Sequence, residues 1–206
     1  MRFSIIVPHY QGSITHEDFC RGIQSIKDQW FDDYEIICIH DGPLLDDTVD
    51  FPCEIQFLEQ RIGDWGHTLR NVGIEQASGE YIIHFNPDNV LRMNALAELD
   101  RRITIDKEPN IVIFMTEMKG LYKDWDKQTL SYPMKDGKRD LSISHVLTGY
   151  PCGYGNIDCM QLVMKTELWK KETWYNCSEQ GDGVMYPAFY EKYGASYVYK
   201  ILGDHY

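Results

Sequence analysis

Four apolar runs in the first half of the sequence each end in residues whose side chains can hydrogen-bond, stack or bind a cation. These ends are Pro8-His9-Tyr10, Asp41-Gly42, the segment from Arg61 to Asp64, and Asn86-Pro87-Asp88-Asn89. Open α/β sheets place ligands beyond the carboxyl ends of their parallel strands. The four ends therefore predict one ligand site at that edge of a sheet. A turn is the competing explanation at each end, because turns favour the same residue types.

Asp88 is the member of this set best suited to hold a metal ion. A hard divalent cation such as Mg²⁺ or Mn²⁺ takes oxygen ligands, and the Asp88 carboxylate can supply one. The chain has a formal net charge of −12, from 32 acidic and 20 basic residues. An anionic ligand would therefore need a cation and a few local basic side chains, whereas a nucleic-acid backbone would be repelled.

Length and composition fit a globular protein outside the membrane. The 206 residues suit one large domain, and 43% of them are hydrophobic and 25% charged. No apolar run approaches the roughly 20 residues that cross a bilayer, and the apolar stretch in MRFSIIVPHY is too short for a signal peptide. The six cysteines include no Cys-x-x-Cys pair, which argues against a disulfide framework or a zinc site. We expect a cytoplasmic protein or a soluble piece of a longer one.

The hydrophobic pattern predicts alternating strands and helices. Strands are expected over residues 3–7, 34–40, 54–59, 81–85, 110–116 and 195–202, and helices over 17–30, 66–77, 93–104, 183–193 and from about Thr166. Continuous apolar runs are typical of strands covered on both faces. We therefore expect an α/β protein with a mainly parallel central sheet flanked by helices. Its first half, residues 1–115, would be of nucleotide-binding type, and residues 116–206 would be more irregular.

The order of motifs resembles that of the family 2 glycosyltransferases, which have the GT-A fold and use nucleotide sugars. SIIVPHY is similar to the first strand and Pro-x-Tyr of the family, and EIICIHDG to its strand ending in Asp-Asp-Gly, with His40 replacing the first acid. LRNVGIEQASGEYIIHFNPDN resembles the stretch from Ala-Arg-Asn-x-Gly to Asp-x-Asp and is the most specific part. The resemblance covers residues 1–90 well and thins through 145–206. It implies a single GT-A domain over residues 1–206, with the acceptor side after residue 115.

The resemblance implies a nucleotide site at the polar strand ends. It assigns to that site Pro8, Tyr10, Asp41, Asp64, Arg70 and Asn86. Tyr10 would stack on the base, and Asp41 would accept the N–H of a uracil. Asn86 would replace a ribose-binding carboxylate by an amide, and Arg70 would reach the nucleotide or tie down its loop.

The resemblance also implies a metal site and a catalytic base. Asp88 stands at the metal-binding acid of Asp-x-Asp, and His205 resembles the late metal-binding histidine of many GT-A enzymes, which favours Mn²⁺ somewhat over Mg²⁺. A solvated terminal residue is the alternative for His205. Asp182 matches the general base of the family, with Gly181 replacing the usual Glu and Glu179 as a second candidate. An acid that only caps a helix is the alternative for Asp182.

Two further segments have an expected role in binding. TGYPCGYGN, residues 148–156, corresponds to the glycine-containing loop that covers donor and acceptor in GT-A enzymes, or is an ordinary surface loop. Arg61 and Asp64 would border the base or form a structural ion pair. Aromatic residues that would stack on sugar rings or belong to the core are Trp125, Tyr150, Tyr154 and Trp174.

These assignments predict an inverting, metal-dependent glycosyltransferase that moves a hexosyl or deoxyhexosyl unit from a UDP-sugar to a hydroxyl of a carbohydrate or glycoprotein. A sugar-nucleotide-binding module without turnover is the main alternative, because Asn86 and Gly181 depart from the family pattern. A nucleotidyltransferase is less well supported, since HYQGSITHED after the first strand is acidic rather than rich in Gly, Arg and Lys. A dinucleotide oxidoreductase would need a G-x-G-x-x-G there. The sequence also resembles glycosyltransferases of large DNA viruses, in which such a chain would be the catalytic domain of a longer polypeptide with further domains.

Overall fold

A sheet of nine strands forms the centre of the fold. The computed structural model describes residues 1–124, 129–175, 178 and 181–206. The strands are β1 (Phe3–His9), β2 (Tyr34–His40), β3 (Ile55–Phe57), β4 (Tyr81–His84), β5 (Val90–Leu91), β6 (Ile111–Lys119), β7 (Tyr122–Asp124), β8 (Thr129–Ser131), β9 (Met134–Lys135), β10 (Lys138–Arg139), β11 (Ser144–Leu147), β12 (Leu162–Lys165) and β13 (Ser196–His205). The helices are α1 (His16–Lys27), α2 (His67–Gln76), α3 (Ala95–Ile105), the short 3-10 helix η1 (Cys159–Gln161), α4 (Thr166–Glu172) and α5 (Gly181–Tyr193).

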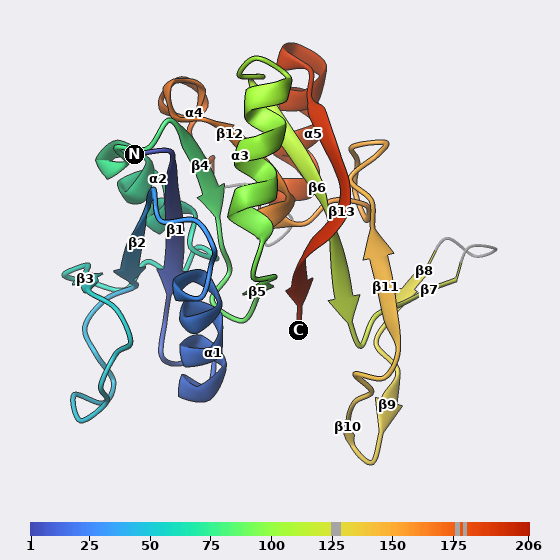
Figure 1. Cartoon of the computed structure of the whole chain (residues 1–206). Helices are drawn as coiled ribbons and strands as arrows, with labels where there is room; N and C mark the ends of the chain where they lie inside the picture. The colour runs from blue at the N-terminus through green and yellow to red at the C-terminus, as the bar shows by residue number, and fades with distance from the viewer. Residues whose placement is uncertain (125–128, 176–177, 179–180) are drawn as a thin grey trace.

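The order of strands in the sheet is β3-β2-β1-β4-β12-β6-β13-β5, with β11 also paired to β6 (Figure 1). Parallel pairs join β3 to β2, β2 to β1, β1 to β4, and β6 to β13. β12 runs antiparallel between β4 and β6. The predicted α/β fold with a mainly parallel sheet is therefore confirmed, and the antiparallel β12 in its middle is an addition that the hydrophobic pattern did not predict.

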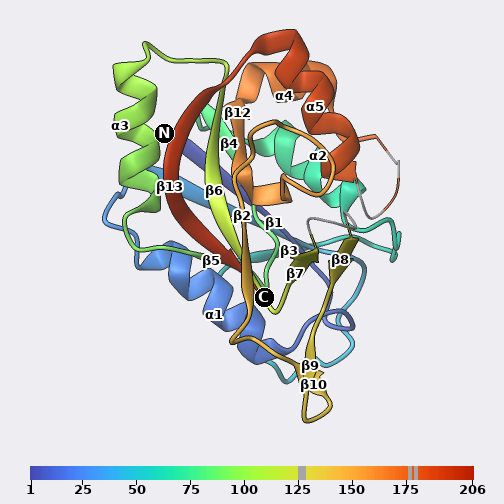
Figure 2. The same ribbon diagram turned by 90° about the vertical axis from the view of Figure 1, so that its right-hand side faces the viewer.

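Helices cover both faces of the sheet. α1 and α3 lie on one face, and α2, α4 and α5 lie on the other (Figure 2). Side chains alternate along β1, so Ile5 and Val7 belong to the hydrophobic cluster that includes Phe19 of α1. Ile6 belongs to the opposite cluster, which includes Leu69 of α2. Continuous apolar runs in the sequence thus reflect strands that are buried on both sides.

The structure changes several predicted boundaries. The helix expected over residues 17–30 ends at Lys27, and two expected strands extend further, to Lys119 and to His205. α2 agrees with its prediction: Gly66 lies just before it with a φ of 81°, a backbone conformation that favours glycine. The polar segment from residue 117 to 156 contains the short strands β7 to β11, which the sequence did not predict.

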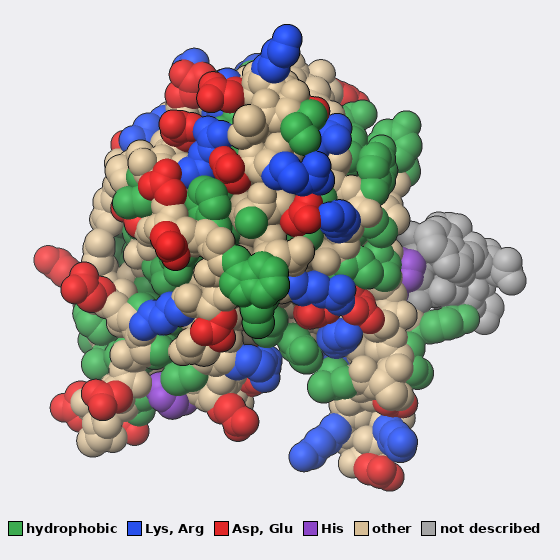
Figure 3. Space-filling view, in the orientation of Figure 1, with side chains coloured by type: hydrophobic (Ala, Val, Ile, Leu, Met, Phe, Trp, Pro, Cys, Tyr) green, Lys and Arg blue, Asp and Glu red, His purple; other side chains and the backbone are tan. Residues whose placement is uncertain are grey.

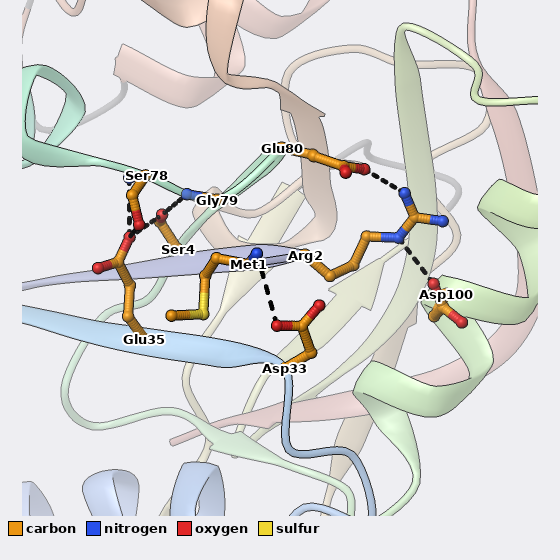
Figure 4. A network of polar contacts seen from close by, with 9 residues as sticks. All are labelled: Met1, Arg2, Ser4, Asp33, Glu35, Ser78, Gly79, Glu80 and Asp100. Atoms are coloured by element: carbon orange, nitrogen blue, oxygen red, sulfur yellow. Dashed lines mark hydrogen bonds and ion pairs between the residues drawn. The ribbon is translucent and has the colours of Figure 1, made fainter.

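A polar network ties together the amino ends of the central strands (Figure 4). Arg2 at the start of β1 donates a hydrogen bond of 2.7 Å to Asp100 on α3. Glu35 Oε1 on β2 accepts from the Ser4 hydroxyl at 2.6 Å and from the Ser78 backbone N–H at 2.8 Å. These bonds fix the edge of the sheet that lies opposite the four polar strand ends, and they leave those ends free for a ligand.

The outer surface carries mixed charge. On the face seen in Figure 3, acidic and basic side chains are interspersed with hydrophobic ones. This face therefore offers no continuous basic stripe to a phosphate backbone.

Within the described parts of the chain, no helix combines the length and apolar character needed to cross a bilayer.

Gly73 marks the closest approach of α2 to the sheet. A Cβ at this position would lie 2.6 Å from Cγ2 of Ile6, which is fully buried on β1. Alanine favours a helix over glycine by about 1 kcal/mol, but overpacking of a core costs roughly 1–3 kcal/mol. We therefore expect Gly73→Ala to lower the free energy of unfolding measured in urea. Glu75→Ala, on the exposed side of the same helix, should change it by less than about 0.5 kcal/mol. A Gly73→Ala protein as stable as the wild type would show that α2 can move away from the sheet at no cost.

Candidate active site

The carboxyl ends of the parallel strands border a cleft of about 480 Å³, a volume typical of small-molecule sites. The residues lining it include Pro8, Tyr10, Asp41, Arg61, Arg70, Asn86, Asp88, Trp174, Gly181 and Asp182. The structure thus brings seven of the nine predicted site residues to one cleft, and Asp64 and His205 lie outside its lining. All four polar strand ends contribute residues to the lining, as the parallel order of β3, β2, β1 and β4 requires.

Asp88 lies in a tight turn after β4. The Asn89 backbone N–H donates to the Asn86 carbonyl at 2.9 Å and closes this turn. Gly22 on α1 allows the helix to touch the turn, because a Cβ there would clash with the carbonyl oxygen of Pro87. Burial raises the pKa of Asp88, and the neighbouring His205 partly offsets this effect. A partly buried carboxylate of this kind gains from a bound cation when it is ionised.

Arg70 on α2 determines how Asn86 presents its amide. The Arg70 side chain is 5% exposed, and its Nη2 donates to Asn86 Oδ1 at 2.7 Å. Its Nη1 donates to the Trp65 carbonyl at 2.9 Å. Because the oxygen of Asn86 is bonded to Arg70, the amide N–H groups remain as donors. The sequence predicted an amide contact to the ligand here, and the structure indicates that it would be a donated hydrogen bond.

The predicted base-binding residues already have partners within the protein. The two oxygens of Asp41 accept backbone N–H groups from Ile62 at 2.7 Å and from Gly63 at 2.9 Å. The Arg61 guanidinium lies over the Tyr10 ring, 4.0 Å from its centroid. A base would therefore use the remaining lone pairs of Asp41 and would either stack on the uncovered face of Tyr10 or displace Arg61.

Asp64 has a structural partner in α2. One of its carboxylate oxygens accepts both the Thr68 backbone N–H at 2.9 Å and the Thr68 hydroxyl at 2.6 Å. Over the described residues, Arg61 and Asp64 form no ion pair with each other, so that alternative is not supported. Asp64 therefore stabilises the first turn of α2, which carries Arg70, and its predicted contact with the nucleotide stays a prediction.

Asp182 lies in the first turn of α5 and lines the cleft. Burial, with a smaller contribution from the Asp158 carboxylate, raises its pKa to about 6. Its Oδ1 accepts the Gly183 backbone N–H at 2.7 Å, which is a bond to the adjacent residue and not a helix cap over a turn. A carboxyl group with this pKa is ionised at neutral pH and basic enough to accept a proton. The second predicted base, Glu179, and the aromatic Trp125 lie outside the described residues.

His205 is the last residue of β13, so the alternative of a solvated terminal residue is wrong. Its Nδ1 lies 3.0 Å from Oδ2 of the buried Asp158. Although burial alone would lower the pKa of His205, Asp158 raises it to about 9.

Asp158 was not predicted, because nothing in the sequence links it to a histidine 47 residues away. The residue caps the short helix η1, and an Asp before a helical turn was the only available signal.

The donor set around Asp88 and His205 is compatible with a divalent cation. Metal-binding histidines commonly hold their second ring nitrogen on a carboxylate, as His205 does with Asp158. Since Nδ1 is engaged, Nε2 is the nitrogen left for a metal, after loss of its proton. Within the described chain, no group of three or more His, Cys, Asp or Glu side chains is arranged to hold a metal. Phosphate oxygens and water would therefore have to complete the coordination.

The loop over residues 148–156 lies against the start of α5. A Cβ on Gly183 would be 3.0 Å from the ring of Tyr154, so the tyrosine packs directly beside Asp182. Tyr154 and Tyr150 are exposed, and Tyr150 makes an edge contact with Tyr197 at 5.5 Å. Trp174 instead is 4% exposed and belongs to the core beneath the cleft, although it also contributes to the lining.

Comparison with known proteins identifies the family of this chain. A family model described as glycosyl transferase family 2 matches residues 4–155, more than half of the chain. The chain belongs to this family. This chain is 30% identical over 142 residues to the GalNAc(5)-diNAcBac-PP-undecaprenol beta-1,3-glucosyltransferase of Campylobacter jejuni. That alignment covers 60% of the chain and 44% of the relative, so the chain spans less than half the length of that protein.

Solved structures show the same fold. S. aureus TarS 1–349 in complex with UDP superposes with a TM-score of 0.67 at 17% identity, covering 99% of the chain and 60% of TarS 1–349. The complex of that protein with UDP-GlcNAc gives a TM-score of 0.65 at 19% identity, covering 99% and 58%. A third TarS structure covers 100% of the chain and 36% of TarS. The predicted GT-A fold and family 2 membership are confirmed.

Proposed function

We propose that this family 2 glycosyltransferase transfers a hexosyl or deoxyhexosyl unit from a UDP-sugar to a hydroxyl of a carbohydrate or glycoprotein acceptor, with inversion. The observation that carries the proposal is the presence of Asp182, a partly buried carboxyl group with a pKa of about 6, in the same cleft as the polar strand ends. The C. jejuni relative is named as a glucosyltransferase, and TarS binds UDP and UDP-GlcNAc, which supports the choice of donor.

The proposed reaction is a single displacement. The acceptor oxygen attacks the anomeric carbon, and the bond between that carbon and the diphosphate oxygen breaks. Asp182 takes the proton of the acceptor hydroxyl, and UDP leaves with the electron pair of the broken bond. Residues 1–115 would bind the nucleotide, and residues 116–206 would form the acceptor side.

The donor would be held by groups at the strand ends. Asn86 donates its amide N–H groups to the donor, with Arg70 fixing the orientation of that amide. Asp88 and His205 would hold Mn²⁺ or Mg²⁺, and such a cation neutralises negative charge on the departing diphosphate. Arg61 and Arg70 bring positive charge to the cleft of a protein whose net charge is −12.

The pKa of Asp182 predicts how activity depends on pH. The base must be ionised, and its pKa is raised to about 6, so it loses its proton as the pH rises through that value. We expect kcat/KM for UDP release to rise about tenfold per pH unit below pH 6 and to level off above it. Glu167→Gln, at the exposed start of α4, should leave this profile unchanged. A profile that is flat between pH 5 and 7 would argue against Asp182 as the base.

Release of UDP tests the function directly. The protein is incubated with UDP-glucose, UDP-GlcNAc and other UDP-sugars, with Mn²⁺ and with carbohydrate acceptors, and UDP is measured. Acceptor-dependent release supports transfer. Binding of a UDP-sugar without any release would favour a module that binds sugar nucleotides, the alternative that the departures at Asn86 and Gly181 suggest.

A further inference from the structure

We propose that Asn71 and His67 on α2 are positioning residues for Asp182, because they hold Trp174 and Ser178, which lie between α4 and α5. The proposal rests on the proposed role of Asp182 as the base. Asn71 lies outside the lining of the cleft, whereas His67 also contributes to it. Asn71 bonds Trp174 and His67 bonds Ser178, both of which precede α5. The two residues are four apart on one helix and therefore lie on the same face.

The bond between Asn71 and Trp174 is reciprocal. Asn71 Nδ2 donates to the Trp174 carbonyl at 2.7 Å, and the Trp174 backbone N–H donates to Asn71 Oδ1 at 2.7 Å. One amide side chain thus satisfies both polar groups of a single backbone residue, 103 positions away in the sequence. His67 adds a second point of attachment, with its Nε2 2.7 Å from the Ser178 carbonyl. A carbonyl only accepts, so Nε2 carries the proton of this ring.

The side chain of Trp174 is fixed in the same way as its backbone. Its Nε1 donates to Nε2 of His84 at 2.8 Å, and burial lowers the pKa of His84 well below its usual value, so the ring remains a neutral acceptor. The indole stacks on Trp169 at 5.7 Å with an interplanar angle of 8°, and on His67 at 5.3 Å with an angle of 20°. Trp174 therefore has one position, and α2 determines where it is relative to the sheet.

The same turn of α2 also reaches the donor side of the cleft. Arg70 lies with its guanidinium carbon 4.8 Å from the Trp174 ring centroid, and it bonds Asn86 at the tip of the sheet. His67, Arg70 and Asn71 thus connect the residue proposed to bind the donor with Trp174. The Trp174 ring in turn lies 5.8 Å from that of Tyr186, which is on α5 four residues after Asp182. A general base must lie within hydrogen-bond reach of its proton, and a displacement of about 1 Å can lower a rate by about 10²-fold.

A purely structural role makes a different prediction from a positioning role. If Asn71 only stabilised the fold, its loss would lower stability and leave the activity of the folded fraction intact. If it acted through Arg70, its loss would weaken UDP binding as much as turnover. A positioning residue for Asp182 affects kcat and leaves UDP affinity nearly unchanged.

The experiment compares Asn71→Ala and His67→Ala with Gln76→Ala. Gln76 lies on the same helix, and its side chain bonds only the exposed Gln56, so this control tests whether damage to α2 alone is sufficient. Three quantities are measured for each protein: kcat and KM for UDP release, UDP affinity by calorimetry, and hydrogen exchange at Trp174 and Gly183. We expect Asn71→Ala to lower kcat by about 10- to 100-fold with UDP affinity within about twofold. His67→Ala should have a smaller effect in the same direction, and Gln76→Ala should match the wild type.

Hydrogen exchange tests the attachment made by Asn71 independently of the proposed reaction. Faster exchange at Trp174 and Gly183 in Asn71→Ala supports the attachment even if the wild type releases no UDP, a result that would defeat the proposed function alone. Unchanged exchange at both residues would overturn the inference. So would a kcat equal to that of the wild type, or a loss of UDP affinity as large as the loss of kcat. If Asn71→Ala does not fold, His67→Ala is judged by the same criteria.

Discussion

Asp182→Asn is expected to lower kcat for transfer from a UDP-sugar by about 10²- to 10⁴-fold, the usual contribution of a positioned general base. UDP affinity should stay within about twofold, because the substitution removes a charge from helix α5 and leaves the strand ends intact. UDP release measured with saturating donor, together with calorimetry of UDP binding, checks both parts.

The stability of Asp182→Asn provides an internal control. Burial raises the pKa of Asp182 to about 6, above its unfolded value, so ionisation of this group costs folded-state stability. The cost grows as the pH rises from the unfolded pKa to about 6 and is constant above that. Asn carries no charge and removes that cost. We therefore expect the variant to melt no lower than the wild type at pH 7.5, and a lost activity cannot then be explained by unfolding.

Glu167→Gln is the matched comparison for Asp182→Asn. Glu167 is also an acid in the first turn of a helix, α4, and it is exposed and outside the cleft. If Asp182 served only the helix dipole, both substitutions would have similar small effects on stability and none on turnover. Full activity in Asp182→Asn would rule out the proposed base.

Asp88→Ala is expected to abolish the dependence of UDP affinity on Mn²⁺. In the wild type, Mn²⁺ should tighten UDP binding, because the cation would be shared by the Asp88 carboxylate, the His205 imidazole and the diphosphate. Without Asp88, the protein keeps its aromatic and amide contacts to the nucleotide but loses the oxygen ligand. Calorimetry measures the UDP affinity with Mn²⁺ and with a chelator. The ratio of these two affinities is compared between the wild type and Asp88→Ala.

Two controls accompany Asp88→Ala. Asp47→Ala removes an exposed carboxylate of the same net charge outside the cleft and should retain the full effect of Mn²⁺. His205→Gln should reduce the effect, since a carboxamide is a weaker ligand than imidazole for Mn²⁺. If UDP binds the wild type equally well with Mn²⁺ and with a chelator, the proposed metal site is wrong, whatever the activity of Asp88→Ala.

Much of the first half of the chain was predictable because its signals are local. The apolar runs of β1, β2 and β4 and the helix between Gly66 and Ala77 each appear within a short window of sequence. The meeting of Asp41, Asn86 and Asp88 at one edge then follows from the parallel order of these strands. The roles of these residues remain predictions, although their proximity is now a structural fact.

The remaining features depend on contacts between distant segments. β12 is only four residues long, and its place in the sheet is set by pairing with β4 on one edge and β6 on the other, which lie far from it in sequence. The pairing of Asp158 with His205 joins a helix cap to the end of β13 and has no periodic signal. The two alternatives for Arg61 were a place beside the base and an ion pair with Asp64, and its stacking on Tyr10 was not predicted because charge was the only cue. Such features require the tertiary fold and are invisible in a hydrophobic pattern.

The position of β12 has a consequence for how the chain folds. β4 and β6 are not hydrogen-bonded to each other in the sheet, and the strand that joins them begins only at Leu162. Until that strand docks, both neighbours present unpaired backbone groups on largely apolar segments that are buried in the folded protein, the kind of edge at which chains associate with one another. Substitutions that delay docking of this short strand would therefore be expected to reduce the yield of soluble protein more than they reduce the melting temperature of the molecules that complete folding.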